Sequence, residues 1–288
     1  MFMQSHTVVG SRVLPYLAKY QAQPIMVFGG IGDTCRRIAQ DYGFRDVLIP
    51  ADVFCWNRDI WPLHTPTEEE QEIARKDFDF SSRPISAAFV FHDPRNWAPD
   101  VQILLDLVRY GSKTRPAFAD KGKRKGGDYR RHSATTNDDG DERVELIFCN
   151  PDLVWRGAYP EPRLGQGGFR EAFQSLHTAL KGKRYEDTRL GKPSTETFHH
   201  AENMLMILAG QTFDTVIPKK SIFMIGDNPE SDIAGANKAG WNSVLVHTGV
   251  FNPGGGPPSH SPTFQARDVE EAVQMALEPP SSQASTLP

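Results

Sequence analysis

Short apolar runs alternate with amphipathic segments along most of the 288-residue chain. Apolar runs bounded by glycine, proline or charged residues are typical of buried strands, and apolar residues spaced three or four apart indicate helices. The predicted strands are Pro24–Gly29, Asp46–Ile49, Ile85–Phe91, Val144–Cys149, Ser221–Ile225 and Asn242–Val246. Because strands and helices alternate, the pattern predicts an α/β protein with parallel strands joined by right-handed crossovers.

The same pattern predicts helices between these strands. They cover Val8–Lys19, Asp33–Tyr42, Glu68–Lys76, Asp100–Tyr110, Phe169–Leu180, Thr195–Leu208, Asp232–Ala239 and Asp268–Leu277. The clearest is Asp100–Tyr110, in which the apolar residues fall on one face.

Two segments depart from this pattern. Gly111–Arg143 carries a basic stretch followed by an acidic one and almost nothing apolar, so we expect a disordered insertion there. An electrostatic docking loop is the alternative interpretation of the same charges. Pro279–Pro288 is expected to be a disordered tail.

Composition narrows the class of protein. Thirty-two basic and 36 acidic residues give a net charge of −4, which argues against a general nucleic-acid binder. The three cysteines are scattered, so they predict no disulfide framework and fit an intracellular setting. No apolar run approaches the roughly 20 residues that span a bilayer. The first residues resemble neither a secretory signal nor an Arg-rich transit peptide.

One acidic cluster directly follows a predicted strand. Gly226-Asp227 comes after the apolar run Ser221–Ile225, and Asp232 begins the next helix. In an open parallel sheet, ligands bind beyond the carboxyl ends of the strands. Two carboxylates at such a place are oxygen ligands of the kind that Mg²⁺ takes. The alternative is that an Asp or Ser here only caps the helix.

A second cluster, Gly191-Lys192-Pro193-Ser194, opens the helix Thr195–Leu208. An ammonium group beside the backbone N–H groups at a helix start favours an anion such as phosphate. The alternative is an ordinary surface lysine before a capped helix. One helix and one strand fit between Lys192 and Asp227, so both motifs are expected at neighbouring strand ends.

In this order, the two motifs resemble those of the haloacid dehalogenase (HAD) superfamily. The closest resemblance is to subfamily IIA, in its cat eye syndrome critical region protein-like branch. Further matching strings are His92-Asp93-Pro94-Arg95-Asn96-Trp97, Asn150-Pro151-Asp152, Gly165–Arg170 and Thr248-Gly249-Val250-Phe251. The resemblance covers most of the chain except Gly111–Arg143 and the tail.

The resemblance implies a Mg²⁺-dependent phosphatase that acts on a small phosphorylated metabolite. Lys192 would balance the charge of the phosphoryl group, Asp227 would bind the metal, and Asp232 would be the supporting metal-site carboxylate. Asn150 and Asp152 would lie in a substrate-facing loop of the cap. The family also leans towards a mitochondrial location; a cytoplasmic one is the alternative.

The implied architecture is a Rossmann-like HAD core with an inserted α/β cap domain. Residues 1–182 would form the cap, residues 183–278 the carboxyl-terminal part of the core, and residues 279–288 the tail.

The family's nucleophile motif, D-x-D-G after an apolar strand, has no match in this sequence. The string Asp77-Phe78-Asp79 lacks a preceding strand and a following glycine, so we interpret it as a surface turn. We therefore expect a core without its first strands, as in a truncated chain, and no phosphatase activity. A non-catalytic binding or structural protein is the alternative. A dinucleotide-binding oxidoreductase is disfavoured, because Phe28–Asp33 lacks the third glycine of that fingerprint.

Overall fold

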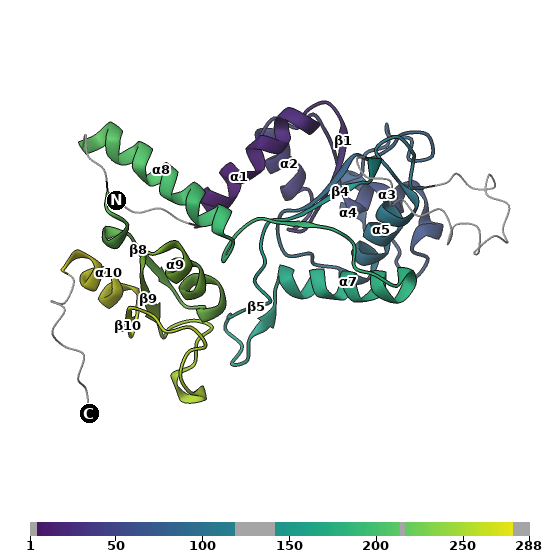
Figure 1. Cartoon of the computed structure of the whole chain (residues 1–288). Coiled ribbons are helices and arrows are strands. Elements are labelled where there is room, and N and C mark those ends of the chain that lie inside the picture. The colour runs from purple at the N-terminus through teal and green to yellow at the C-terminus, as the bar shows by residue number, and fades with distance from the viewer. Residues whose placement is uncertain (1–4, 119–141, 214–216, 279–288) are drawn as a thin grey trace. The chain divides into compact units, whose positions relative to one another are not determined.

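A computed structural model describes residues 5–118, 142–213 and 217–278 (Figure 1). The chain divides into two compact units. The five-stranded unit comprises Val13–Leu153 and Gly165–Leu190, and the three-stranded unit comprises Met1–Arg12, Val154–Leu164 and Gly191–Pro288. Each unit is described by itself below.

All strands of the larger sheet in the five-stranded unit are parallel, in the order β2-β1-β3-β4-β7. The strands are β1 (Pro24–Phe28), β2 (Asp46–Leu48), β3 (Ala87–Val90), β4 (Glu145–Phe148) and β7 (Thr188–Arg189). The helices are α2 (Thr34–Asp41), α3 (Pro50–Trp56), α4 (Glu68–Ile73), α5 (Trp97–Tyr110) and α7 (Gln166–Lys181), with a short 3₁₀ turn at Arg58–Ile60. Helix α1 (Ser5–Tyr20) enters this unit at Val13.

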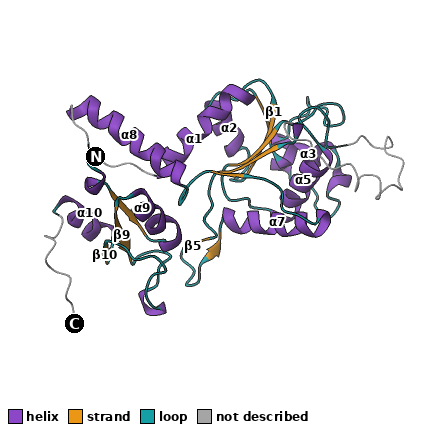
Figure 2. Ribbon diagram, in the orientation of Figure 1, coloured by secondary structure: helices purple, strands orange, loops and turns teal. Residues whose placement is uncertain are grey.

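Helices cover both faces of this sheet (Figure 2). On one face, Met26, Phe28 and Val90 join a core cluster with residues of α3, α5 and α7. On the other face, the Phe89 ring contacts the rings of Tyr16 and Tyr20 on α1. Parallel strands that are buried on both faces are continuously apolar, which explains why β1 and β3 are such uniform apolar runs.

The three-stranded unit also has a parallel sheet, in the order β10-β9-β8. Its strands are β8 (Phe223–Gly226), β9 (Asn242–Val246) and β10 (Phe264–Ala266), and its helices are α8 (Thr195–Phe213), α9 (Ala234–Ala239) and α10 (Val269–Leu277). Short helical turns lie at Lys219–Ser221, Pro229–Ile233 and Pro253–Gly255. A separate hairpin pairs β5 (Val154–Trp155) with β6 (Arg163–Leu164).

The predicted α/β class with parallel sheets is confirmed, and every predicted strand is present. The sequence pattern missed β5, β6, β7 and β10, which are each only two or three residues long, and α3. Such short strands contain too few positions for a periodicity to show.

The expected disordered insertion at Gly111–Arg143 is too wide. Ala117 and Phe118 are 3% and 5% exposed and belong to the core of the five-stranded unit. The N–H of Lys113 donates to the carbonyl oxygen of Glu142 at 2.8 Å, which ties the two ends of the segment together. The ends of the segment are ordered because Ala117 and Phe118 are buried in the core, although the segment as a whole is polar. Residues 119–141 and the expected tail at 279–288 lie outside the described residues.

Among the described residues, no helix combines the length and the apolar character needed to cross a membrane.

Candidate functional site

The carboxyl end of β8 positions Asp227. Gly226 is the last residue of the strand, and the side chain of Asp227 meets the loop that follows β9. The N–H of Val250 donates to Asp227 Oδ2 at 2.7 Å, and the N–H of Phe251 donates to the Asp227 carbonyl oxygen at 3.0 Å. The carboxylate is therefore fixed between two neighbouring strand ends, as the parallel order of β8 and β9 requires.

Asp232 is positioned by the turn that follows β8. The side chain of Asn228 accepts a hydrogen bond from the N–H of Glu230 at 3.0 Å and starts a π-helical turn over Pro229–Ile233. This turn brings Asp232 back against the strand, where its Oδ2 accepts a hydrogen bond from the N–H of Asn228 at 3.0 Å. Asp232 is 1% exposed. A Cβ atom at Gly226 would lie 2.2 Å from the Asp232 carboxyl, so only glycine permits this approach.

Lys192 contacts Asp232 across 40 positions of sequence. Its Nζ lies 2.5 Å from Asp232 Oδ1, just before helix α8 begins. The side chain of Lys192 is 22% exposed, whereas that of Asp232 is 2% exposed. The ammonium group thus neutralises a buried carboxylate and still reaches solvent. An opposite charge close by is what a buried carboxylate requires.

The structure therefore brings the three predicted residues of the three-stranded unit to one edge of its sheet. Lys192 and Asp232 are in direct contact, and Asp227 follows the glycine against which Asp232 packs. The two other predicted site residues, Asn150 and Asp152, belong to the five-stranded unit.

Asn150 and Asp152 lie in a tight loop after β4. Asn150 Oδ1 accepts a hydrogen bond from the N–H of Asp152 at 2.9 Å, and the Asn150 N–H donates to Gln166 Oε1 at 2.8 Å. The N–H of Gly167 donates to the Asp152 carbonyl oxygen at 2.9 Å. This loop is thus fixed to the first turn of α7, and it requires glycine at 167, where a Cβ would lie 2.4 Å from the Pro151 carbonyl oxygen.

Few side chains at this site are available to bind a metal ion. No group of three or more His, Cys, Asp or Glu side chains converges among the residues that the structure describes. The two carboxylate oxygens of Asp232 accept from Lys192 and from the Asn228 N–H, and Asp227 Oδ2 accepts from Val250. Because Mg²⁺ keeps several waters and needs only one or two protein carboxylates, Asp227 Oδ1 fits a single protein ligand.

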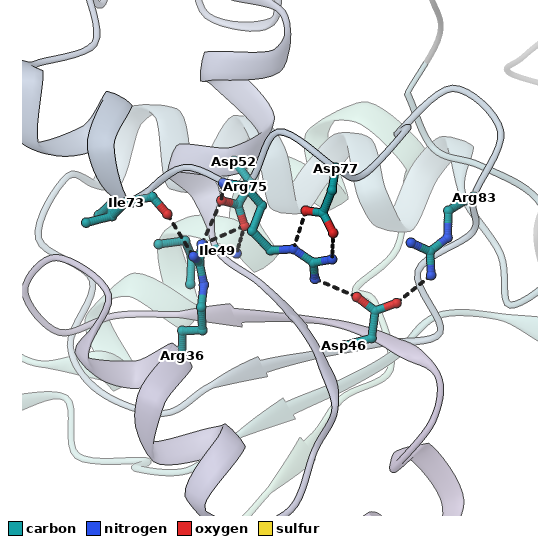
Figure 3. A network of polar contacts seen from close by, with 8 residues as sticks. All are labelled: Arg36, Asp46, Ile49, Asp52, Ile73, Arg75, Asp77 and Arg83. Atoms are coloured by element: carbon teal, nitrogen blue, oxygen red, sulfur yellow. Dashed lines mark hydrogen bonds and ion pairs between the residues drawn. The ribbon is translucent and has the colours of Figure 1, made fainter.

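A second polar cluster, which the sequence pattern did not indicate, lies in the five-stranded unit (Figure 3). Asp52 is fully buried, and both of its oxygens accept from Arg36 Nη2, at 2.6 and 2.8 Å. The N–H groups of Ile49 and Arg75 donate to the same carboxylate at 2.8 and 2.7 Å. Arg36 also donates to the Ile73 carbonyl oxygen at 2.8 Å. Because this carboxylate is enclosed by protein donors, the cluster holds α2, α3 and the end of α4 together and offers no binding site.

The string Asp77-Phe78-Asp79 continues this cluster at the surface. Asp77 pairs with Arg75 at 2.8 Å, and Asp79 Oδ1 accepts a hydrogen bond from the Ser81 N–H at 2.9 Å. Phe78 between them is 2% exposed, with the Arg83 guanidinium 4.2 Å from its ring centroid. The two aspartates are turn and ion-pair residues, in agreement with the predicted surface turn, but the residue between them is buried.

Comparisons with protein families, curated relatives and solved structures give consistent findings. A family described as HAD-hydrolase-like matches residues 189–272. A Saccharomyces cerevisiae protein named mitochondrial hydrolase is 33% identical over 294 residues, covering 96% of this chain and 77% of that protein. A Schizosaccharomyces pombe cardiolipin synthase (CMP-forming)/mitochondrial hydrolase fusion protein is 38% identical over 280 residues, covering 96% of this chain. The chain spans only 42% of the length of that fusion protein.

Two solved structures share the fold. A possible sugar phosphatase of the HAD superfamily from Cytophaga hutchinsonii has a TM-score of 0.51 at 18% identity, covering 90% of this chain and 69% of its own. A hypothetical protein from Pyrococcus horikoshii has a TM-score of 0.50 at 18% identity, covering 92% and 73%. The chain belongs to the haloacid dehalogenase-like hydrolases, as its motifs predicted.

Proposed function

We propose that this chain carries the charge-balancing and metal-binding half of a Mg²⁺-dependent phosphatase site that takes a small phosphorylated metabolite. The observation that carries the proposal is the contact of Lys192 with Asp232, beside Gly226-Asp227 at the carboxyl end of β8. A cation and two carboxylates at the end of a parallel strand suit a metal-bound phosphate.

Each residue has a distinct role in this proposal. Asp227 holds the metal through Oδ1, and its Oδ2 stays bonded to the Val250 N–H. Lys192 binds the phosphate oxygens from the start of α8, where the helix dipole also favours an anion. Asp232 keeps the Lys192 ammonium at the rim of the pocket. A bound Mg²⁺ would neutralise charge on the phosphoryl oxygens.

The five-stranded unit is proposed to be the cap, with Asn150 and Asp152 in its substrate-facing loop. Their loop is held rigidly against α7, which suits a surface that must present fixed polar groups to a small ligand. A mitochondrial location is proposed because the two relatives described above carry the words mitochondrial hydrolase in their names.

Turnover requires a nucleophile, and the sequence contains no D-x-D-G string. We therefore expect these 288 residues to bind Mg²⁺ and phosphate without hydrolysing phosphomonoesters. The same observation favours the second candidate function, a non-catalytic binding protein that retains the cap and the pocket.

Calorimetry on the purified chain tests the proposal, with Mg²⁺ and inorganic phosphate as ligands. Asp227→Asn is expected to weaken Mg²⁺ binding by about tenfold or more, and Lys192→Met to weaken phosphate binding similarly, because each removes a charged partner. Lys238→Met, at an exposed position of α9, is the matched control and should change neither. A wild-type chain that binds neither ligand would show that this pocket does not exist.

A parallel assay with p-nitrophenyl phosphate tests the missing nucleophile. The expected result is no Mg²⁺-dependent turnover. Robust turnover that Asp227→Asn abolishes would show that a nucleophile is present elsewhere in these residues.

A further inference from the structure

The loop that follows β9 contacts the Asp227 carboxylate in two ways: Val250 donates a hydrogen bond to it, and the backbone of Gly249 packs directly against it. A Cβ atom at Gly249 would lie 1.9 Å from Asp227 Oδ2 and 2.3 Å from its Cγ. No real Cβ atom approaches a side chain so closely, so any larger residue at 249 must displace the carboxylate or the loop. The backbone of Gly249 forms a wall against one side of Asp227, and the next residue, Val250, donates the hydrogen bond.

Gly255, further along the chain after β9, has no such constraint. Gly255 lies six positions further along, and a Cβ atom there would meet nothing within 4 Å. A substitution at Gly255 therefore changes the same loop region without touching the carboxylate. The requirement for glycine at 249 comes from Asp227 itself.

The hairpin of β5 and β6 supplies a second constraint on this wall. Arg156, directly after β5, donates from Nη1 to the Gly249 carbonyl oxygen at 3.1 Å. Both residues belong to the three-stranded unit, although 93 positions separate them in the sequence. Arg163 of the same hairpin instead donates to the carbonyl oxygens of Glu161 and Pro162, within its own turn.

We propose that Gly249 and Arg156 are positioning residues for Asp227: Gly249 makes room for the carboxylate, and Arg156 holds the carbonyl group of Gly249 in place. The metal-binding consequence rests on the proposed function, in which Asp227 binds Mg²⁺. The geometric consequence does not, because it concerns only the hydrogen bond from the Val250 N–H to Asp227 Oδ2. The two consequences are therefore measured separately.

The first experiment compares Gly249→Ala with Gly255→Ala in the whole chain. Gly249→Ala is expected to weaken Mg²⁺ binding about tenfold or more, as an overpacked contact implies. In metal-free protein, hydrogen exchange of the Val250 amide, followed by NMR, is expected to accelerate by a similar factor because its acceptor is displaced. Gly255→Ala should match wild type in both measurements.

The second experiment compares Arg156→Ala with Arg163→Ala. Loss of one hydrogen bond to the wall predicts about threefold faster exchange of the Val250 amide and about threefold weaker Mg²⁺ binding in Arg156→Ala. Arg156→Lys, which keeps a donor, should recover part of this loss, and Arg163→Ala should have no effect.

The outcomes distinguish this proposal from the proposed function. If wild type fails to bind Mg²⁺, the proposed function is wrong, and Val250 exchange alone decides the positioning role. If wild type binds Mg²⁺ but Gly249→Ala leaves both affinity and Val250 exchange unchanged, the positioning role is wrong. Circular dichroism shows whether Gly249→Ala is folded. If it is not, the Arg156 variants test the positioning role instead. Equal changes of Mg²⁺ affinity and Val250 exchange in Arg156→Ala and Arg163→Ala would then overturn the proposal.

Discussion

Each unit of the molecule contains a buried carboxylate that pairs with a cationic side chain, and the two cations differ in exposure. Asp52 in the five-stranded unit is fully buried against Arg36, which is itself 8% exposed. Asp232 in the three-stranded unit is 1% exposed, yet its partner Lys192 has a side chain that is 22% exposed. A planar guanidinium closes a carboxylate off by a two-oxygen contact, whereas a flexible ammonium can also reach a ligand. Arg36–Asp52 is therefore an ion pair that only stabilises the fold, whereas Lys192–Asp232 is an ion pair whose cation is also accessible to an anionic ligand.

Strand β8 is also less buried than β3. Every residue of β3 is buried, whereas every residue of β8 is only half-buried. Strand β8 is nevertheless the one that ends at Gly226-Asp227. The five-stranded unit therefore carries the buried ion pair that stabilises the fold, and the three-stranded unit carries the residues proposed to bind.

The largest expected effect comes from breaking the structural ion pair. Asp52→Ala leaves the Arg36 guanidinium buried without its partner, which typically costs about 3–5 kcal/mol in the free energy of unfolding. Denaturant unfolding, followed by tryptophan fluorescence, measures this change. Asp77→Ala removes an exposed ion pair of the same cluster and should leave stability unchanged. Equal losses in the free energy of unfolding for Asp52→Ala and Asp77→Ala would contradict the view that the buried ion pair stabilises the fold more than the exposed one.

The next effect depends on pH and concerns Asp100 on α5. Burial, with a smaller contribution from the Glu70 charge, raises the pKa of Asp100 to about 7. The folded state therefore keeps a proton that the unfolded chain releases near pH 4, so this group lowers stability as the pH rises from about 4 to 7.

Asp100→Asn removes that titration. The variant is expected to be more stable than wild type at pH 8, by up to roughly 4 kcal/mol for a pKa difference of about three units, and similar to wild type near pH 4. Thermal unfolding of both proteins across this range provides the measurement. A stability difference that stays constant with pH would contradict the assignment.

The smallest effects concern glycines in the helices of the three-stranded unit. A Cβ atom at Gly235 on α9 would lie 2.2 Å from the Phe198 ring, so Gly235→Ala is expected to destabilise the protein by about 1–3 kcal/mol. Gly210 on α8 has nothing within 4 Å, so Gly210→Ala should stabilise it by up to about 1 kcal/mol through helix propensity. Thermal unfolding should give opposite signs; equal signs would show that packing does not distinguish these glycines.

Much of the candidate site was visible in the sequence because each residue follows or precedes a regular element. Asp227 comes directly after β8, and Lys192 precedes the start of α8 at Thr195. The expectation of neighbouring strand ends was wrong for Lys192, because the strand before it, β7, pairs with β4 in the five-stranded sheet and not with β8. The sequence could not show that Lys192 contacts Asp232, because they are 40 positions apart. Nor could it show Arg156 against Gly249 or Arg36 against Asp52, since no periodicity links such pairs.

The six longer strands, their alternation with helices, the parallel α/β class and the motif positions were determined by the sequence alone. They depend on local apolar spacing and on the backbone preferences of glycine and proline, which are properties of neighbouring residues. Only the tertiary structure decided which buried charge has which partner, and which glycine leaves room for a carboxylate. Those outcomes depend on how distant segments pack against each other, where differences of less than an ångström separate a contact from a clash.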